Sequence, residues 1–126
     1  MKHTYVSALS TYWRGCEWIF TKSDDFNTLT WLSHDTPKPT LEELEARMIE
    51  LDLLEAKRLL RIKRNEMLRE SDVKSLPDYP HKNEEDRISW LIYRQQLRDV
   101  TKTTMPSLTP MYELDEASIE WPTLPQ

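Results

Sequence analysis

The sequence has almost no glycine and almost no cysteine. Gly15 is the only glycine and Cys16 the only cysteine among its 126 residues. Phosphate-binding loops and dinucleotide-binding turns need several glycines, because backbone amides must approach the ligand closely. One thiol cannot form an internal disulfide or a cysteine-based zinc site. We therefore expect no nucleotide cofactor and no metal.

Long apolar runs and a basic face are also missing. No stretch approaches the about 20 apolar residues that cross a bilayer, and the N-terminal residues lack the unbroken apolar segment of a signal peptide. The net charge is -5, and residues 105–126 hold four acidic and no basic side chains. Nucleic-acid binding needs clustered Lys and Arg to displace phosphate counterions. We expect a soluble cytoplasmic protein without a membrane or nucleic-acid partner.

Residues that could perform catalysis are scattered along the chain. His3, His34 and His81 are far apart, and none is paired with another at metal-ligand spacing. His34 adjoins Asp35, but neighbouring side chains on an extended segment point apart. We therefore predict no catalytic, metal-binding or cofactor-binding residue. An enzyme that uses Cys16 and His34 is the least favoured of three alternatives.

Residues 1–36 are rich in aromatic and β-branched side chains and predict a small β element. Apolar and polar residues alternate over 17–21 and 28–32, as in half-buried strands, and the polar segment 22–27 separates them. This pattern predicts a hairpin. Because two strands alone are marginally stable, we expect a first strand near residues 5–9, followed by a turn at Arg14-Gly15, to complete an antiparallel meander.

A long helix is predicted after Thr40, which stands at an N-cap position with Glu43 three residues later. The following 31 residues contain no glycine or proline, and their acidic side chains precede most of the basic ones, as the helix dipole favours. Such a helix spans roughly 45 Å, whereas a compact chain of this size is about 35 Å across. It therefore protrudes or is covered by its own domain, a partner or a second copy. Its candidate partner-binding residues are Leu44, Met48, Leu51, Leu59 and Ile62.

A second helix is predicted over residues 84–100. Pro77 and Pro80 prevent the long helix from continuing and force extended backbone just before each of them, and Asn83 is a suitable N-cap. The connection of about a dozen residues allows the second helix to fold back on the first as a helical hairpin. One face of the second helix carries the apolar residues Trp90, Tyr93, Leu97 and Val100.

Residues 105–126 read as an extended, acidic, proline-rich tail. Trp121-Pro122 is its one aromatic anchor and a candidate partner-binding site. The predicted fold class is thus α+β: a small antiparallel β-meander, a long helix and a shorter helix in a hairpin, and an extended tail. The predicted domains are 1–36 for the β element, 37–104 for the helical hairpin, and 105–126 for the tail.

Three segments carry a likeness to a known family: RIKRNEMLRESDVKSLPDYP, RISWLIYRQQLRDV and the late WPTLP. Their order and spacing resemble the phage tail assembly chaperone family over roughly residues 57–124. Family members commonly carry tryptophan after the Ser71-Asp72 pair, where this chain has Val73. The matching residues that we interpret as specifying the hairpin are Arg64, Asn65, Ser71, Asp72, Pro77, Asp78, Trp90, Tyr93 and Leu97.

The resemblance implies a role in building or completing a phage tail or its fibres, without an enzymatic step. Its implied partners are other phage tail or tail-fibre proteins, and its implied location is the host cytoplasm during assembly. Retention in the virion as a tail or baseplate adaptor is a second version of this role. A homo-oligomeric fibre or collar protein, bundled through the long helix, is the alternative. The hairpin residues have two interpretations, fold specification and direct partner contact, and we favour the first.

Overall fold

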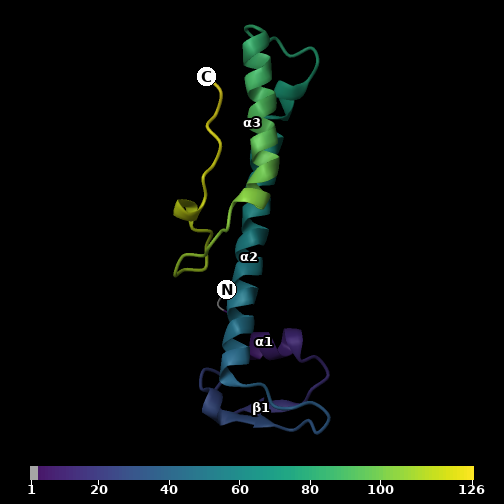
Figure 1. Ribbon diagram of the computed structural model, residues 1–126, viewed down its shortest axis with the longest axis vertical. Coiled ribbons are helices and arrows are strands. Elements are labelled where there is room, and N and C mark those ends of the chain that lie inside the picture. Colours follow the sequence, from purple (N-terminus) through teal and green to yellow (C-terminus); the bar gives the residue numbers. More distant parts are fainter. Residues whose placement is uncertain (1–2) are drawn as a thin grey trace. The chain divides into compact units, whose positions relative to one another are not determined.

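A computed structural model describes residues 3–126 of the chain (Figure 1). The chain divides into two compact units, Met1–Leu54 and Glu55–Gln126, and the long helix α2 (Leu41–Glu70) contributes to both. The first unit contains a two-stranded sheet and the second contains a pair of helices, so the α+β class is confirmed.

The first unit contains the predicted hairpin. Strands β1 (Trp18–Phe20) and β2 (Leu29–Trp31) pair antiparallel, with Trp18 opposite Trp31. Gly15, at φ +82°, forms the expected turn before β1, because glycine adopts this conformation without steric cost. A small core supports the sheet, and its buried residues are Ala8, Leu9, Leu29 and Leu44.

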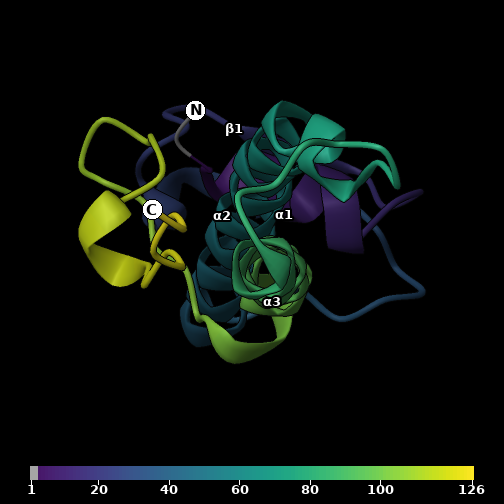
Figure 2. The same cartoon turned by 90° about the horizontal axis from the view of Figure 1, so that it is seen from above.

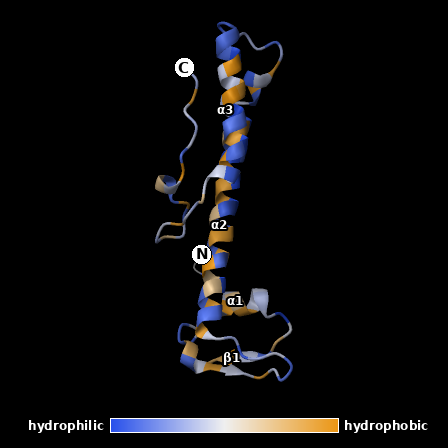
Figure 3. Ribbon diagram, viewed as in Figure 1, coloured by the Kyte–Doolittle hydropathy of each residue, from blue (hydrophilic) through white to orange (hydrophobic). Residues whose placement is uncertain are grey.

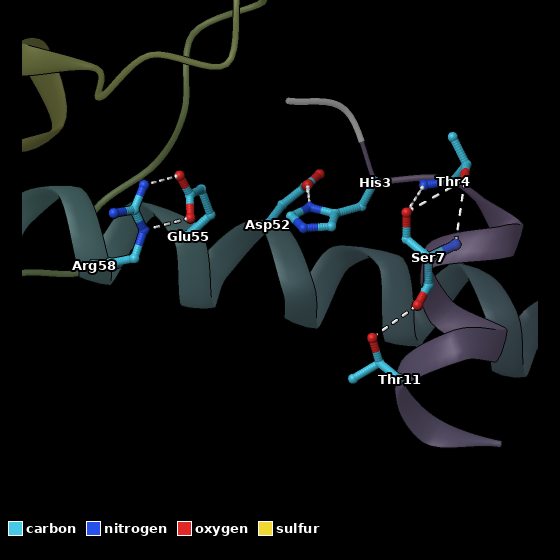
Figure 4. A network of polar contacts seen from close by, with 7 residues as sticks. All are labelled: His3, Thr4, Ser7, Thr11, Asp52, Glu55 and Arg58. Carbon is cyan, nitrogen blue, oxygen red and sulfur yellow. Dashed lines mark hydrogen bonds and ion pairs between the residues drawn. The ribbon is translucent and has the colours of Figure 1, made fainter. Parts of the chain in front are cut away.

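The predicted first strand near residues 5–9 is wrong, because this segment forms helix α1 (Tyr5–Tyr12). Thr4 and Ser7 form a reciprocal capping box: the Thr4 hydroxyl accepts the Ser7 N–H at 3.3 Å, and the Ser7 hydroxyl accepts the Thr4 N–H at 3.2 Å (Figure 4). The adjacent residues Ala8 and Leu9 are both fully buried. Burial of two neighbours is incompatible with the alternation of a strand, so helical packing determined the local structure.

Helix α2 begins directly after Thr40, as predicted, and ends one residue before the end of the predicted run. The Thr40 hydroxyl accepts the Glu43 N–H at 3.1 Å and donates to the Glu43 carboxylate at 3.3 Å. The helix then continues to Glu70 without interruption. Figure 3 shows polar and apolar residues interleaved along it, and among the residues the structure describes no helix is both long and apolar enough to cross a membrane.

The second unit contains a pair of helices, part of α2 and all of α3 (Glu84–Thr103), as predicted. Helix α3 begins at Asn83, whose side chain accepts the Asp86 N–H at 2.8 Å. Hydrogen bonds join Arg94 to Leu68 and Arg64 to Thr101. In these two contacts the residue number is higher on α3 where it is lower on α2, so the two helices run antiparallel within this unit (Figure 1). Figure 2 shows α3 end-on.

The C-terminal tail lies along the hairpin of the second unit (Figure 1). It is extended apart from a bridge between Leu108 and Leu114 and the short 3-10 helix η3 (Glu116–Ser118). Ile119, only 7% exposed, packs with Leu60 of α2 and Val100 of α3. The tail therefore supplies part of the core that joins the two helices.

Candidate partner-binding surface

Arg94 is the centre of the polar network that ends α2. Its side chain is 9% exposed, and Nη1 donates to the Leu68 carbonyl and to the Ser71 hydroxyl, both at 2.7 Å. Nη2 donates to the Asp72 carboxylate at 2.7 Å. The last carbonyls of a helix lack intrahelical partners, and the planar guanidinium serves one of them while it binds the following Ser-Asp pair.

These contacts support a structural role for Ser71 and Asp72, whose assignment as hairpin-specifying residues stays a prediction. Arg94 lies in the matching segment RISWLIYRQQLRDV, but it was not among the residues interpreted as specifying the hairpin. Its position gave a signal, because it lies between Trp90 and Leu97 on the predicted inner face of α3. A charged side chain on a buried face requires a charged or hydrogen-bonding partner.

The other hairpin-motif residues fall into a buried group and an exposed group. Tyr93 and Leu97 are buried in α3, and Trp90 packs edge-on against the Tyr93 ring with centroids 5.6 Å apart. Burial, together with the negative charge of Glu70, raises the pKa of the Tyr93 phenol. Trp90 is half-buried. Four further motif residues, two on α2 and two in the following turn, are also half-buried or exposed: Arg64, Asn65, Pro77 and Asp78.

Local contacts explain those four residues. Arg64 donates to the Asn65 side chain at 3.0 and 3.2 Å and to the Thr101 hydroxyl at 3.3 Å. Pro77 and Asp78 are the central residues of a turn that the Tyr79 N–H closes on the Leu76 carbonyl at 3.1 Å. Pro at the second position of such a turn is favoured because its φ is already fixed.

Two of the predicted partner-binding residues lie in the core of the first unit. Leu44 is fully buried there, and Met48 packs against the same core. A partner could reach Leu44 only if that core opened, so its role in partner binding stays a prediction. Leu51 is half-buried on the same helix.

The structure brings Leu59 and Ile62 together in a groove of the second unit. The groove has a volume of about 370 Å³, and its apolar lining comes from these two residues of α2 and from Tyr112 and Leu114 of the tail. Ile62 is 44% exposed. Trp121 and Pro122, also predicted to bind a partner, are half-buried in the tail, and Trp121 packs beside Ile119.

A tight loop of the tail forms one wall of the groove. The Thr109 N–H donates to the Glu113 carbonyl at 2.7 Å, and the Tyr112 N–H donates to the Thr109 carbonyl at 2.8 Å. Residues 110–112 therefore form a three-residue hairpin loop, a type whose last residue is normally left-handed and often glycine. Here Tyr112 occupies this position with φ 60°, which costs about 1–2 kcal/mol of backbone strain.

Four glutamates and one lysine also line the groove. Glu116 pairs with Lys63 and accepts the Trp121 indole N–H at 2.9 Å. The hydrogen bond from Lys63, and then that from Trp121, lower the pKa of the Glu116 carboxyl. Glu55 binds the Arg58 guanidinium at 2.7 and 2.9 Å (Figure 4).

The remaining two glutamates of the groove, Glu66 and Glu113, have no ion pair within residues 3–126. Both side chains are exposed. The groove therefore combines an apolar lining with an excess of negative charge, of which two carboxylates are not neutralised.

Cys16, His34 and Asp35 lie in the lining of one cavity of about 430 Å³ in the first unit. Because Cys16 lies far from His34 and Asp35 in the sequence, nothing in the sequence indicated that all three would lie in one cavity. Within the described residues, however, no hydrogen bond joins these three side chains, and no group of His, Cys, Asp and Glu side chains is arranged to hold a metal ion. His3 pairs through Nδ1 with Asp52 at 2.6 Å and so ties the N-terminal segment to α2 within the first unit (Figure 4).

Comparison with known proteins gives one match. A family model described as phage tail assembly chaperone protein matches residues 57–126, which is more than half of the chain. The match includes α2 from residue 57 onward, α3, the tail and all of the groove except Glu55. No curated protein and no solved structure matches the chain.

Proposed function

Because the chain belongs to the phage tail assembly chaperone family, we propose that it assists phage tail assembly by binding tail or tail-fibre proteins, with no chemical step of its own. It acts in the host cell, where tails are built. The matched segment is the part of the chain that carries the Leu59–Ile62 groove, and this coincidence is the observation that supports the proposal most directly.

The residues proposed to contact a partner are those of the second unit that combine apolar character with solvent access. Ile62 is the most exposed apolar residue of the groove, and Leu59 lies beside it. Trp121 and Pro122 are half-buried in the tail. Aromatic and apolar side chains of this kind are typical anchors of protein interfaces.

Co-expression tests this proposal. Each tail and tail-fibre protein of the phage is produced with and without this chain, and the soluble fraction and co-purification are measured. We expect at least one of them to become more soluble and to co-purify. Loss of the gene should also leave phage heads without finished tails in electron micrographs. Normal tails in its absence, with no co-purification, would contradict the proposal.

A second candidate function is a homo-oligomeric fibre or collar protein that bundles through α2. Three apolar side chains on this helix favour it, because Ile49, Leu54 and Ile62 are 70%, 51% and 44% exposed. Exposed apolar residues along one helix are typical of a helix that packs against another. Sedimentation at tens of micromolar separates the two candidates, since a stable trimer or larger bundle supports the second and a monomer excludes it.

A further inference from the structure

The groove between α2 and the tail has an unbalanced charge. Its apolar lining is bordered by Glu66 and Glu113, which have no cationic partner within residues 3–126. A protein that covered this lining with a neutral or acidic surface would remove both carboxylates from water without compensation. Burial of unpaired charge is strongly unfavourable.

We propose that the groove binds a segment of a partner protein that presents apolar side chains on one side and Lys or Arg beside them. The apolar side chains contact Leu59, Ile62 and Leu114, and the cations pair with Glu66 and Glu113. This proposal rests on the proposed function, because it names the chemistry of the partner that the chaperone binds. It adds the site and the sequence character of the bound segment.

The charge pattern distinguishes this occupant from others. Glu55 and Glu116 are already paired with Arg58 and Lys63, so the uncompensated charge lies at Glu66 on α2 and at Glu113 on the tail loop. An incoming cation at each of these two positions would complete a set of ion pairs around the apolar contact. Electrostatic complementarity of this kind sets partner choice and association rate more than affinity.

The strained loop residue belongs to the same site. Tyr112 lines the groove and keeps an unfavourable left-handed conformation at a position where glycine would be unstrained. Strain of this type persists mainly where a side chain is needed for function. The Tyr112 ring thus supplies an aromatic contact for the bound segment.

The probe for the test is a fluorescein-labelled 14-residue peptide with leucines at helical spacing and lysines at the other positions. A matched peptide carries glutamate in place of every lysine. Fluorescence anisotropy measures binding of both peptides to the full-length chain. We expect the lysine peptide alone to bind, and its affinity to fall as NaCl rises from about 0.05 to about 0.5 M, because salt screens exposed charges.

Substitutions in the groove are compared with the same substitutions elsewhere on α2. Ile62→Ser should weaken binding of the lysine peptide about tenfold, whereas Ile49→Ser should have no effect. Glu66→Lys should weaken it several-fold more than Glu45→Lys, which makes the same change in net charge. All four positions are exposed, so circular dichroism should show an unchanged fold. Methyl chemical shifts of Leu59, Ile62 and Leu114 should move when the lysine peptide is added.

Equal binding of the lysine peptide by the Ile62→Ser and Ile49→Ser variants would contradict the assignment of the groove as the binding site. Equal binding of the lysine and glutamate peptides would overturn the charge requirement. Self-association that Ile62→Ser abolishes would also overturn the proposal, because a second copy would then fill the groove. If tail proteins still co-purify with the Ile62→Ser and Glu66→Lys variants, the chaperone function stands and only the groove assignment fails.

Discussion

Arg94 and Tyr112 have structural roles that the residues beside them in the sequence do not predict. Arg94 reaches from α3 to the end of α2, and Tyr112 keeps a left-handed backbone in the tail loop. The sequence could place Arg94 on an inner helix face, but it could not show that Leu68, Ser71 and Asp72 would converge there. It gave no signal for Tyr112, because a left-handed residue is predicted with confidence only where glycine or asparagine occupies the position.

Replacing Arg94 should destabilise the hairpin. In Arg94→Met, the Ser71 hydroxyl and the Leu68 carbonyl lose their buried donor, and we expect a loss of about 2 kcal/mol in the free energy of unfolding. Urea denaturation followed by circular dichroism measures this loss. The control is Arg98→Met on the same helix, because Arg98 is exposed and, within residues 3–126, donates a single hydrogen bond, to the Gln95 side chain at 3.3 Å. An equal effect of both substitutions would contradict the role assigned to Arg94.

Replacing Tyr112 should raise the stability of the protein and weaken its binding of the lysine peptide. Tyr112→Gly relieves the left-handed strain, and we expect the protein to gain up to about 1 kcal/mol of stability. The same change removes the aromatic contact from the groove, so the affinity for the lysine peptide should fall. Thermal denaturation and anisotropy measure the two effects. Tyr112→Asn, which also tolerates the left-handed region, should behave in the same way, and loss of stability in both variants would exclude strain at this residue.

The secondary-structure elements differ in how far the sequence predicts them. Helix α2 combines an N-cap, an ordered charge pattern and 30 residues without glycine or proline, so several independent signals agree. Helix α1 is only eight residues long, and its Thr4–Ser7 capping box uses a serine where glutamate or glutamine is usual. Over so short a segment, aromatic and β-branched residues favoured a strand, and packing of Ala8 and Leu9 against the core decided otherwise.

The N-cap residue of α2, Thr40, should contribute to the stability of the protein. Thr40→Ala removes the hydroxyl that accepts the Glu43 N–H, and we expect a loss of about 1 kcal/mol of stability. Thr40→Ser retains the acceptor and should lose much less. Thermal denaturation followed at 222 nm, a helix signal, compares the two variants. Equal stability of Thr40→Ala and Thr40→Ser would mean that the first turn is held by packing alone.

Docking of the tail on the hairpin should weaken in acid. The pKa of Glu116 is lowered by hydrogen bonds from Lys63 and Trp121, so its ionised form stabilises the docked tail. This contribution is complete above the pKa of the unfolded chain, about 4.3, and is lost as the pH falls through the lower pKa of the folded state.

Hydrogen exchange over residues 105–126, compared at neutral pH and near pH 3 after correction for intrinsic rates, measures tail docking. The correction matters because exchange chemistry itself depends on pH. Glu116→Gln keeps an acceptor for the Trp121 indole but cannot ionise, so its tail protection should change less between the two conditions. An identical acid response in the native chain and in Glu116→Gln would assign the effect to other carboxylates.

At the scale of the whole molecule, the sequence predicted the class of function better than the site. The family resemblance covered roughly residues 57–124, and the family match over residues 57–126 confirms it. Periodicity selected Leu59 and Ile62, but the groove also needs Tyr112 and Leu114, about 50 residues further along the chain. Only the folded tail brings these residues together. Periodicity also selected Leu44, because a buried apolar residue and a partner-binding one give the same pattern.

After assembly the protein should not remain in the finished phage particle. A groove of about 370 Å³, bordered by exposed charges that salt can screen, is suited to a small interface, and small polar interfaces are typically transient. We therefore expect the chain to be absent from purified virions and present in host lysates during assembly, as measured by quantitative peptide mass spectrometry against a major tail protein. A fixed integer number of copies per tail would contradict transient binding, and would assign the protein to the tail or baseplate as an adaptor.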